Sequence, residues 1–282
     1  MNSHTTVAAM FLIAGAGAAA AGLSPWRQFD AALDTPGDTA WENTGSLQGG
    51  QAQNFSFATA QSPVSVNDPI ATGLSAAYEI GTTGVIDGAN WSFWGQAGGG
   101  RANHAETSYE LFFRVDNLTG NHLIMEIGGG AAGVSMGMQD GEFIWATNPG
   151  GAGADDTHSV SAGIGLGWNH AVAVWNRNTL STALYLNGQF VGDVALDPDT
   201  TGWTGGNEAT LGGFSTRTGA SAATTMDIAS LTDFDGAIAA FNYYNGELTA
   251  EQIEANYNAV FIPAPGSIAL LGAGVLATRR RR

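Results

Sequence analysis

Carboxylates are the side chains of this sequence best suited to chemistry, because its 282 residues include 25 Asp and Glu but no Cys. Asp197, Asp199 and Glu208 occupy positions one, three and twelve of a segment that partly fits the calcium loop of an EF-hand. Position five is Thr201, and no helical pattern flanks the segment. We therefore predict a loop site for Ca²⁺ rather than an EF-hand.

A second acidic group, Asp227, Asp233 and Asp235, precedes the last predicted strand. Carboxylate and carbonyl oxygens are the ligands that Ca²⁺ prefers, and a bound ion would offset the repulsion between these acids. The alternative for both groups is that the acids are solvated and keep the protein soluble. Calcium is therefore a candidate cofactor with two candidate sites.

Two tryptophans are candidates for stacking on sugar rings. Trp203 lies in a segment of Gly and Thr, and Trp94 precedes a Gly-rich segment, so we expect both indoles to be exposed. Trp91, Trp168 and Trp175 lie within predicted strands and are interpreted as core residues.

The histidines do not form a recognisable catalytic motif. His104, His122, His158 and His170 are spread along the chain, and no nucleophile-elbow sequence accompanies them. His170 shares its strand face with Val172, so we interpret it as a hydrogen-bonded structural residue. Glu247, Glu251 and Glu254 have helical spacing and are expected to form a solvated face.

The charge balance excludes one class of partner. All nine basic residues are Arg, and four of them are the last four residues of the chain. Residues 24–261 contain five Arg against 25 acids, a net charge of −20. Binding to nucleic acid requires clustered cations to neutralise phosphates, so a nucleic-acid partner is not expected.

Residues 1–22 are predicted to be an export signal peptide. Their apolar, Ala-rich run from Val7 to Ala21 has the length of a secretory h-region and is too short to span a membrane. Small residues near Ala18 offer a cleavage zone. The alternative is a disordered N-terminus or a misplaced start codon.

Residues 262–282 are predicted to be a sorting tail. Two prolines stop the preceding helix, a short apolar segment follows, and the terminal Arg block would stay on the cytoplasmic side of a membrane. This order resembles a PEP-CTERM signal, although Ala264 replaces the usual central Glu. The resemblance implies an exosortase-type partner, transient insertion in the inner membrane and a Gram-negative cell envelope or extracellular location. The residues that support it are Pro263, Ala264, Pro265, Gly266, Arg279, Arg280, Arg281 and Arg282.

The region between these ends has the pattern of an all-β sandwich. Tyr109, Leu111, Phe113 and Val115 alternate with Glu110, Phe112 and Arg114, as in a strand with two different faces. Asp140-Gly141 and Asn187-Gly188 are strong hairpin signals. Further strands are predicted at Leu123–Ile127, Val134–Met138, Phe143–Trp145, Trp168–Trp175, Ala183–Leu186, Gln189–Val194 and Ala237–Tyr244.

One helix is predicted near the end of this region. Thr249 and Gln252 form a capping-box pattern, and Ile253 and Tyr257 give the helix an apolar stripe. Residues 23–75 are rich in Gly, Asn, Gln and Pro, and we expect a loop-rich start that contributes the opening strands of one domain over residues 23–261.

The C-terminal half resembles a laminin-G-like (concanavalin A-like) jelly-roll domain. The resemblance rests on Trp168-Asn-His-Ala-Val-Ala-Val, Leu184-Tyr-Leu-Asn-Gly, Leu211-Gly-Gly, the strand from Phe234, and the closing helix. It implies an antiparallel two-sheet jelly roll, one sheet convex and one concave, with one short C-terminal helix. Related hydrolases carry Glu-x-Asp-x-x-Glu on one strand, a spacing that does not occur in this sequence.

We therefore expect an exported, non-enzymatic protein that binds polysaccharide or matrix components. The first alternative is a structural or adhesive matrix protein without a small-ligand site. The second is a divergent glycan lyase or hydrolase.

Overall fold

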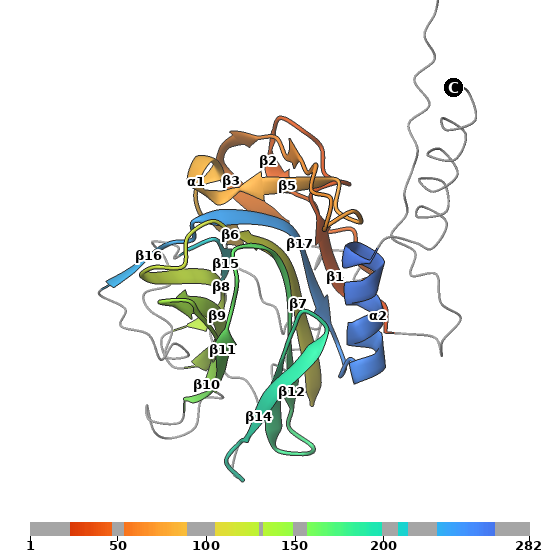
Figure 1. Ribbon diagram of the computed structural model, residues 1–282, viewed down its shortest axis with the longest axis vertical. Coiled ribbons are helices and arrows are strands. Elements are labelled where there is room, and N and C mark those ends of the chain that lie inside the picture. Colours follow the sequence, from red (N-terminus) through yellow and green to blue (C-terminus); the bar gives the residue numbers. More distant parts are fainter. Residues whose placement is uncertain are drawn as a thin grey trace, which may run out of the picture.

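The computed structural model describes seven parts of the chain: residues 23–46, 54–88, 105–129, 132–148, 157–198, 208–213 and 230–262 (Figure 1). They form two sheets that pack face to face, and nearly all of the strand pairs are antiparallel. A single longer helix lies on the outside of one sheet. The predicted all-β jelly-roll sandwich with one short C-terminal helix is confirmed.

Sheet A contains the central strand of the fold, β7 (Glu106–Val115), which is hydrogen-bonded to β12 (Gly167–Asn176) on one side and to β17 (Gly236–Tyr244) on the other. At one end, β1 (Arg27–Asp30) and β5 (Ala76–Glu79) pair with different parts of β17. In order across the sheet, the strands are β14 (Gln189–Ala195), β13 (Ser181–Leu186), β12 (Gly167–Asn176), β7 (Glu106–Val115), β17 (Gly236–Tyr244), β5 (Ala76–Glu79) and β4 (Val64–Ser65), with β1 (Arg27–Asp30) beside β17.

Sheet B packs against the inner face of sheet A. Its one parallel pair joins β16 (Leu231–Asp233) to β8. In order, the other strands are β11 (His158–Gly163), β10 (Glu142–Asn148), β9 (Ala132–Gln139), β8 (Asn121–Gly129), β15 (Glu208–Leu211), β6 (Ile86–Gly88), β3 (Phe55–Gln61) and β2 (Asp38–Trp41). The loop-rich start thus contributes strands to both sheets, and a short helix, α1 (Ile80–Thr83), follows β5.

The core lies between the two sheets, as the alternation in the sequence predicts. Tyr109, Leu111, Phe113 and Val115 of β7 are buried in it, together with apolar residues of β8, β9 and β10. Burial of large apolar side chains is the main favourable contribution to folding, at about 1.5–3 kcal/mol for each fully buried side chain. The alternate residues of β7 therefore face the other way, toward α2.

The helix α2 (Ala250–Phe261) covers the outer face of sheet A (Figure 1). It begins at the predicted capping box: the Thr249 hydroxyl accepts from the Gln252 N–H at 3.3 Å, and the Gln252 side chain accepts from the Thr249 N–H at 2.9 Å. Ile253 and Val260 are buried against the sheet, and Tyr257 is partly buried. Within the described parts of the chain, no helix is both long and apolar enough to cross a membrane.

Both predicted hairpin turns form, with positive φ at both central residues, as a type I′ turn requires. Asn187 has φ 51° and Gly188 has φ 77°. A Cβ at position 188 would lie 3.0 Å from the Tyr257 ring, so this turn also supports α2.

Replacing Gly188 with Ala is expected to lower the free energy of unfolding by about 1–2 kcal/mol, because a side chain is strained at this φ and would contact Tyr257. The measurement is urea unfolding followed by tryptophan fluorescence. Gly165→Ala is the matched control, since a Cβ there meets nothing within 4 Å. Equal stability of the two variants would contradict the prediction.

Candidate functional site

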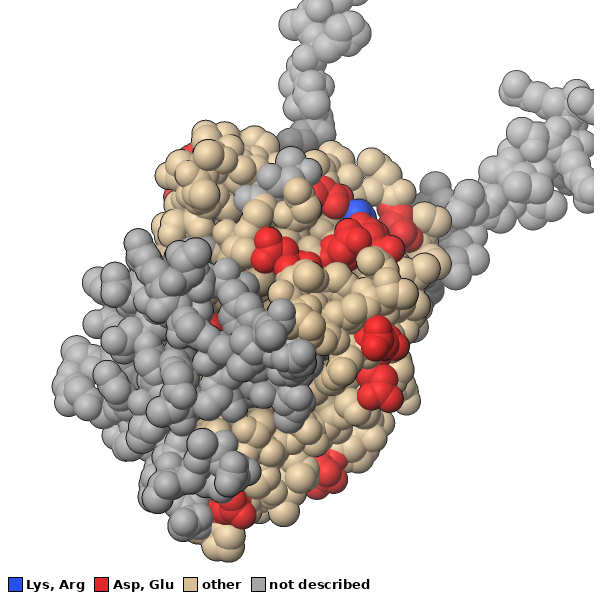
Figure 2. Space-filling view, turned by 90° about the vertical axis from the view of Figure 1, so that its left-hand side faces the viewer, with Lys and Arg blue, Asp and Glu red and all other residues tan. Residues whose placement is uncertain are grey.

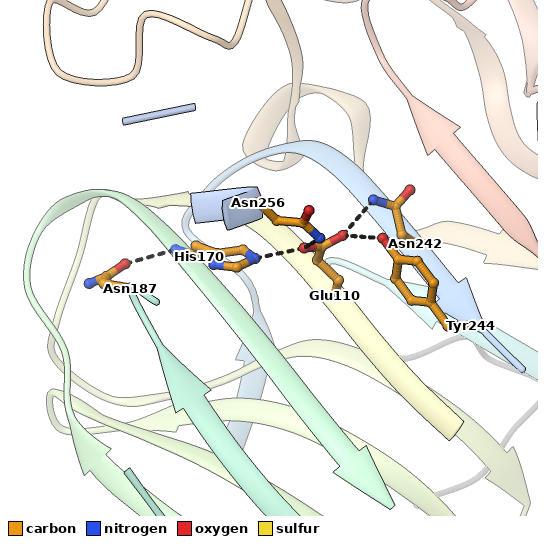
Figure 3. Close-up of polar contacts among 6 residues, drawn as sticks. All are labelled: Glu110, His170, Asn187, Asn242, Tyr244 and Asn256. Atoms are coloured by element: carbon orange, nitrogen blue, oxygen red, sulfur yellow. Dashed lines mark hydrogen bonds and ion pairs between the residues drawn. The ribbon is translucent and has the colours of Figure 1, made fainter. Parts of the chain in front are cut away.

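A buried carboxylate organises the outer face of sheet A beneath α2 (Figure 3). Glu110 lies at the middle of β7 and is 1% exposed. Each of its two oxygens accepts two hydrogen bonds, so four donors surround one charge. The donors to Oε1 are His170 Nε2 at 2.9 Å and Asn256 Nδ2 at 2.8 Å; the donors to Oε2 are Asn242 Nδ2 at 2.8 Å and the Tyr244 hydroxyl at 2.6 Å.

Strand register brings these groups together. His170 lies on β12 and Asn242 and Tyr244 on β17, the two strands that flank β7, and Asn242 is paired directly with Glu110. Asn256 reaches the same carboxylate from α2. Glu110 therefore joins three adjacent strands to the helix that covers them.

The hydrogen bonds decide the protonation state of this cluster. Burial alone would raise the pKa of Glu110, but the hydrogen bond and charge of His170 and the bonds from Tyr244 and Asn242 hold it below its ordinary value of 4.5. Burial, and then the Glu110 charge, raise the pKa of the Tyr244 hydroxyl well above 10. At neutral pH the carboxylate is therefore ionised and the phenol protonated.

His170 is fully buried and hydrogen-bonded, as the sequence analysis expects. Its ring stacks on Phe112, with centroids 4.5 Å apart, and lies beside Tyr257 of α2. Its backbone N–H donates to the Asn187 side chain at 2.9 Å. A solute cannot reach a pair that is 0–1% exposed, so in this structure the Glu110–His170 pair positions α2 rather than acting on a substrate.

Most of the residues predicted to bind a ligand or direct sorting lie outside the described residues. The structure places Glu208 at the start of β15 but does not describe its side chain. The others outside are Trp94, Trp203, Asp199, Asp227, Pro263, Ala264, Pro265, Gly266, Arg279, Arg280, Arg281 and Arg282. Their predicted roles stay predictions.

The remaining calcium candidates lie near the ends of strands. Asp197 follows β14, and its carboxylate is 3.5 Å from His158 Nε2. Asp233 and Asp235 are exposed on either side of buried Phe234, and the Asp233 carboxylate packs against Gly213. No group of three or more potential metal ligands occurs within the described residues. Both proposed calcium sites include undescribed members and stay predictions.

Sequence reasoning did not single out two acids that the strand register places on outer faces. Glu110 is one, and Glu126 on β8 is the other. Glu126 is fully buried, and it pairs with Thr210 of β15, which in turn pairs with Asp87 of β6. The sequence did hold a signal for both acids, because each is a charged residue inside an apolar strand pattern. A charge in that position indicates the face of the strand that points away from the core.

Comparison with known families identifies the class of this fold. The laminin-G-type model of the concanavalin A-like lectin/glucanases superfamily matches residues 87–254, more than half of the chain. The chain therefore belongs to that superfamily. No curated protein matches it.

Three solved structures resemble this chain at low sequence identity, and the first of them shows the same fold. The botulinum neurotoxin serotype D/C binding domain has a TM-score of 0.53 and 13% identity, covering 84% of this chain and 52% of that one. The Ruminococcus gnavus IT-sialidase CBM40, bound to α2,3-sialyllactose, has a TM-score of 0.43 and 12% identity. The match covers 54% of this chain and 82% of that one. Mouse laminin α1 domains LG4-5 have a TM-score of 0.41 and 14% identity. The match covers 52% of this chain and 37% of that one. The chain spans about half or less of the neurotoxin and laminin chains.

Replacing Glu110 with Gln is expected to lower the free energy of unfolding by about 3 kcal/mol at pH 7, because three neutral donors and His170 lose a charged acceptor. The folded pKa of Glu110 is depressed, so its contribution is present above the unfolded value and is lost as pH falls through the folded value.

Urea unfolding at pH 7 and at successively lower pH measures this effect. The difference between the wild type and Glu110→Gln should shrink below about pH 4. Glu254→Gln, an exposed change on α2, the helix that covers Glu110, is the control and should stay within about 0.5 kcal/mol of the wild type. A difference that does not depend on pH would contradict the ionised state assigned to Glu110.

Proposed function

We propose that this protein is an exported, non-catalytic module that binds polysaccharide or matrix components in the cell envelope or extracellular matrix. The observation that carries the proposal is the superfamily match over residues 87–254, because lectins are among the members that name the superfamily. A fold alone does not define a ligand, so the activity needs its own test.

The surface charge bears on the choice of partner. Figure 2 displays acidic side chains scattered over the described part of one face, with one small basic spot among them. Of the described arginines, Arg27 is buried and Arg114 is held by Glu79 and Asp116 at 2.8 and 2.7 Å. An acidic surface repels polyanions, so neutral or cationic partners are favoured over acidic ones.

The proposal includes export through residues 1–22 and processing of residues 262–282 by an exosortase-type enzyme. The end of α2 supports a separate tail: the helix stops at Phe261, and Ile262 adopts an extended backbone (φ −110°, ψ 112°). A residue that precedes proline favours this conformation, and Pro263 follows. The last described helix thus ends immediately before the proposed sorting signal.

Replacing Arg279, Arg280, Arg281 and Arg282 with Ser is expected to leave the precursor unprocessed, because the cationic block would no longer hold the C-terminus on the cytoplasmic side. Mass spectrometry of the protein from inner-membrane and outer fractions measures the C-terminal residue in each. Equal processing of the variant and the wild type would contradict the sorting proposal.

Polysaccharide binding is tested by affinity electrophoresis of the protein through gels that contain neutral, cationic or acidic polysaccharides. Migration is expected to slow in at least one glycan gel but not in a blank gel. Addition of EDTA tests the predicted calcium, and Trp94→Ala and Trp203→Ala test the predicted stacking residues. Each Ala variant should lose roughly 5-fold in affinity if its indole stacks on a sugar.

The outcomes of these gels separate the alternatives. Unchanged migration in every gel would contradict binding to the tested glycans and favour a structural or adhesive protein without a small-ligand site. Release of reducing or unsaturated ends from a polysaccharide would favour a divergent glycan hydrolase or lyase.

A further inference from the structure

An aromatic pair lies on the outer face of sheet A at the edge hairpin formed by β13 and β14. Tyr185 and Phe190 are cross-strand partners, and a bulge between Leu184 and Tyr185 shifts the register there. Leu184 faces the core, so its neighbour Tyr185 faces outward and Phe190 lies beside it. The two rings meet edge to face, with centroids 5.3 Å apart and an interplanar angle of 66°.

The two rings differ in how they are supported. Tyr185 packs against the apolar cluster under the start of α2, which includes Val172, Leu248 and Ile253. Phe190 is 57% exposed. A supported ring beside an exposed one forms a pre-ordered apolar surface with a low entropic cost of binding, because Phe and Tyr have only two side-chain torsions each.

Three exposed carboxylates lie near Tyr185. Asp193 of β14 pairs with Ala183 and lies on the same outer face as Tyr185, while Glu247 precedes α2 and Glu251 lies in its first turn. Burial raises the pKa of the Tyr185 hydroxyl, and the negative charges of Glu247, Glu251 and Asp193 raise it further, so all three act on the same point. Asn176 donates a hydrogen bond to Glu247.

The charge of this group is not neutralised within the protein as far as the structure describes it. The described ion pairs join Arg114 to Glu79 and Asp116, His158 to Asp197, and His170 to Glu110. None of them includes Asp193, Glu247 or Glu251. We call these three acids with Tyr185 and Phe190 the aromatic–acidic surface. It combines two rings with three unpaired negative charges.

We propose that the aromatic–acidic surface binds a polysaccharide whose sugars carry free amino groups. This inference rests on the polysaccharide binding proposed above and adds the class of sugar. The apolar C–H face of a pyranose ring packs on the Phe190 and Tyr185 rings, while protonated amines lie near Asp193, Glu247 and Glu251. Ammonium groups gain both from the carboxylates and from the aromatic faces. An acidic polysaccharide would be repelled here.

The charge and the rings act on different parts of such a ligand. Charge alone attracts any polycation, including a Lys-rich peptide, whereas the rings favour the flat face of a sugar. The location at an edge hairpin also suits a long polymer, because a chain can pass across the surface without entering a cavity. We therefore favour an amino-sugar polymer over a basic peptide.

Isothermal titration calorimetry of the full chain with a fully deacetylated, β1,4-linked glucosamine hexamer tests the proposal. The hexamer is expected to bind, and its N-acetylated counterpart to bind at least about 10-fold more weakly, because acetylation removes the charge. Phe190→Ala and Asp193→Asn are each expected to weaken binding of the glucosamine hexamer by about 5-fold. Added salt should weaken it as well.

Two control variants make the same kinds of change as Asp193→Asn and Phe190→Ala, but at positions outside the aromatic–acidic surface. Glu42→Gln removes a negative charge after β2, at the opposite end of sheet B from β11, the strand that lies against β14. Leu166→Ala removes another exposed apolar side chain, which is 63% exposed before β12. Both variants should bind the glucosamine hexamer like the wild type.

The possible failures are distinguishable. If the glucosamine hexamer does not bind while another polysaccharide slows migration in the gels, the amino-sugar inference is wrong and polysaccharide binding stands. If neither occurs, both are wrong. Binding that Phe190→Ala and Asp193→Asn leave unchanged would place the site elsewhere. Hexalysine binding as tight as that of the hexamer, with the same losses in both variants, would overturn the sugar class in favour of peptide amines.

Discussion

The requirement that a buried charge be fully hydrogen-bonded explains much of how sheet A and its helix are arranged. Glu110 satisfies that requirement with donors from β12, β17 and α2, and no single element could supply all four. The helix must therefore sit where Asn256 reaches the carboxylate, which fixes its register against the sheet. That register sets where the helix starts, and hence where Glu251 lies relative to Tyr185 on the β13–β14 hairpin.

Local features of the fold were predictable because their causes lie close together in sequence. The Asn187-Gly188 turn and the Thr249–Gln252 capping box each depend on residues one to three positions apart. The Glu110 cluster was not predictable in this way. His170 and Asn256 lie 60 and 146 residues from Glu110, so their meeting depends on strand order and helix docking. The alternation identified the correct face of β7, but not what would cover it.

The candidate sites also differ in whether they depend on residues close in sequence or on the tertiary fold. A ligand set that is contiguous in sequence, such as Asp233 and Asp235, can be proposed from composition, whereas the aromatic–acidic surface depends on a one-residue bulge. The two-residue turn pairs Phe190 with Tyr185, but without the shift between Leu184 and Tyr185 the next acid, Asp193, would pair with Thr182 instead of Ala183 and face the opposite side. Resemblance to laminin-G-like domains predicted the sandwich, and membership of the superfamily is now established over residues 87–254. Neither identifies which of the outward-facing residues meets a partner.

The pairing of β1 with β17 has a consequence for how an exported chain would fold. Arg27–Asp30 lies near the start of the sandwich, and its hydrogen-bonding partners, Ala240–Tyr243, lie near its end. A chain that emerges across a membrane from its N-terminus would present β1 long before its partner strand arrives. Sheet A could close only when nearly all of the domain had crossed, since β17 is also the neighbour of β7. In the proposed export, late closure of sheet A would keep the chain unfolded while it crosses the membrane and would couple completion of the fold to completion of transport.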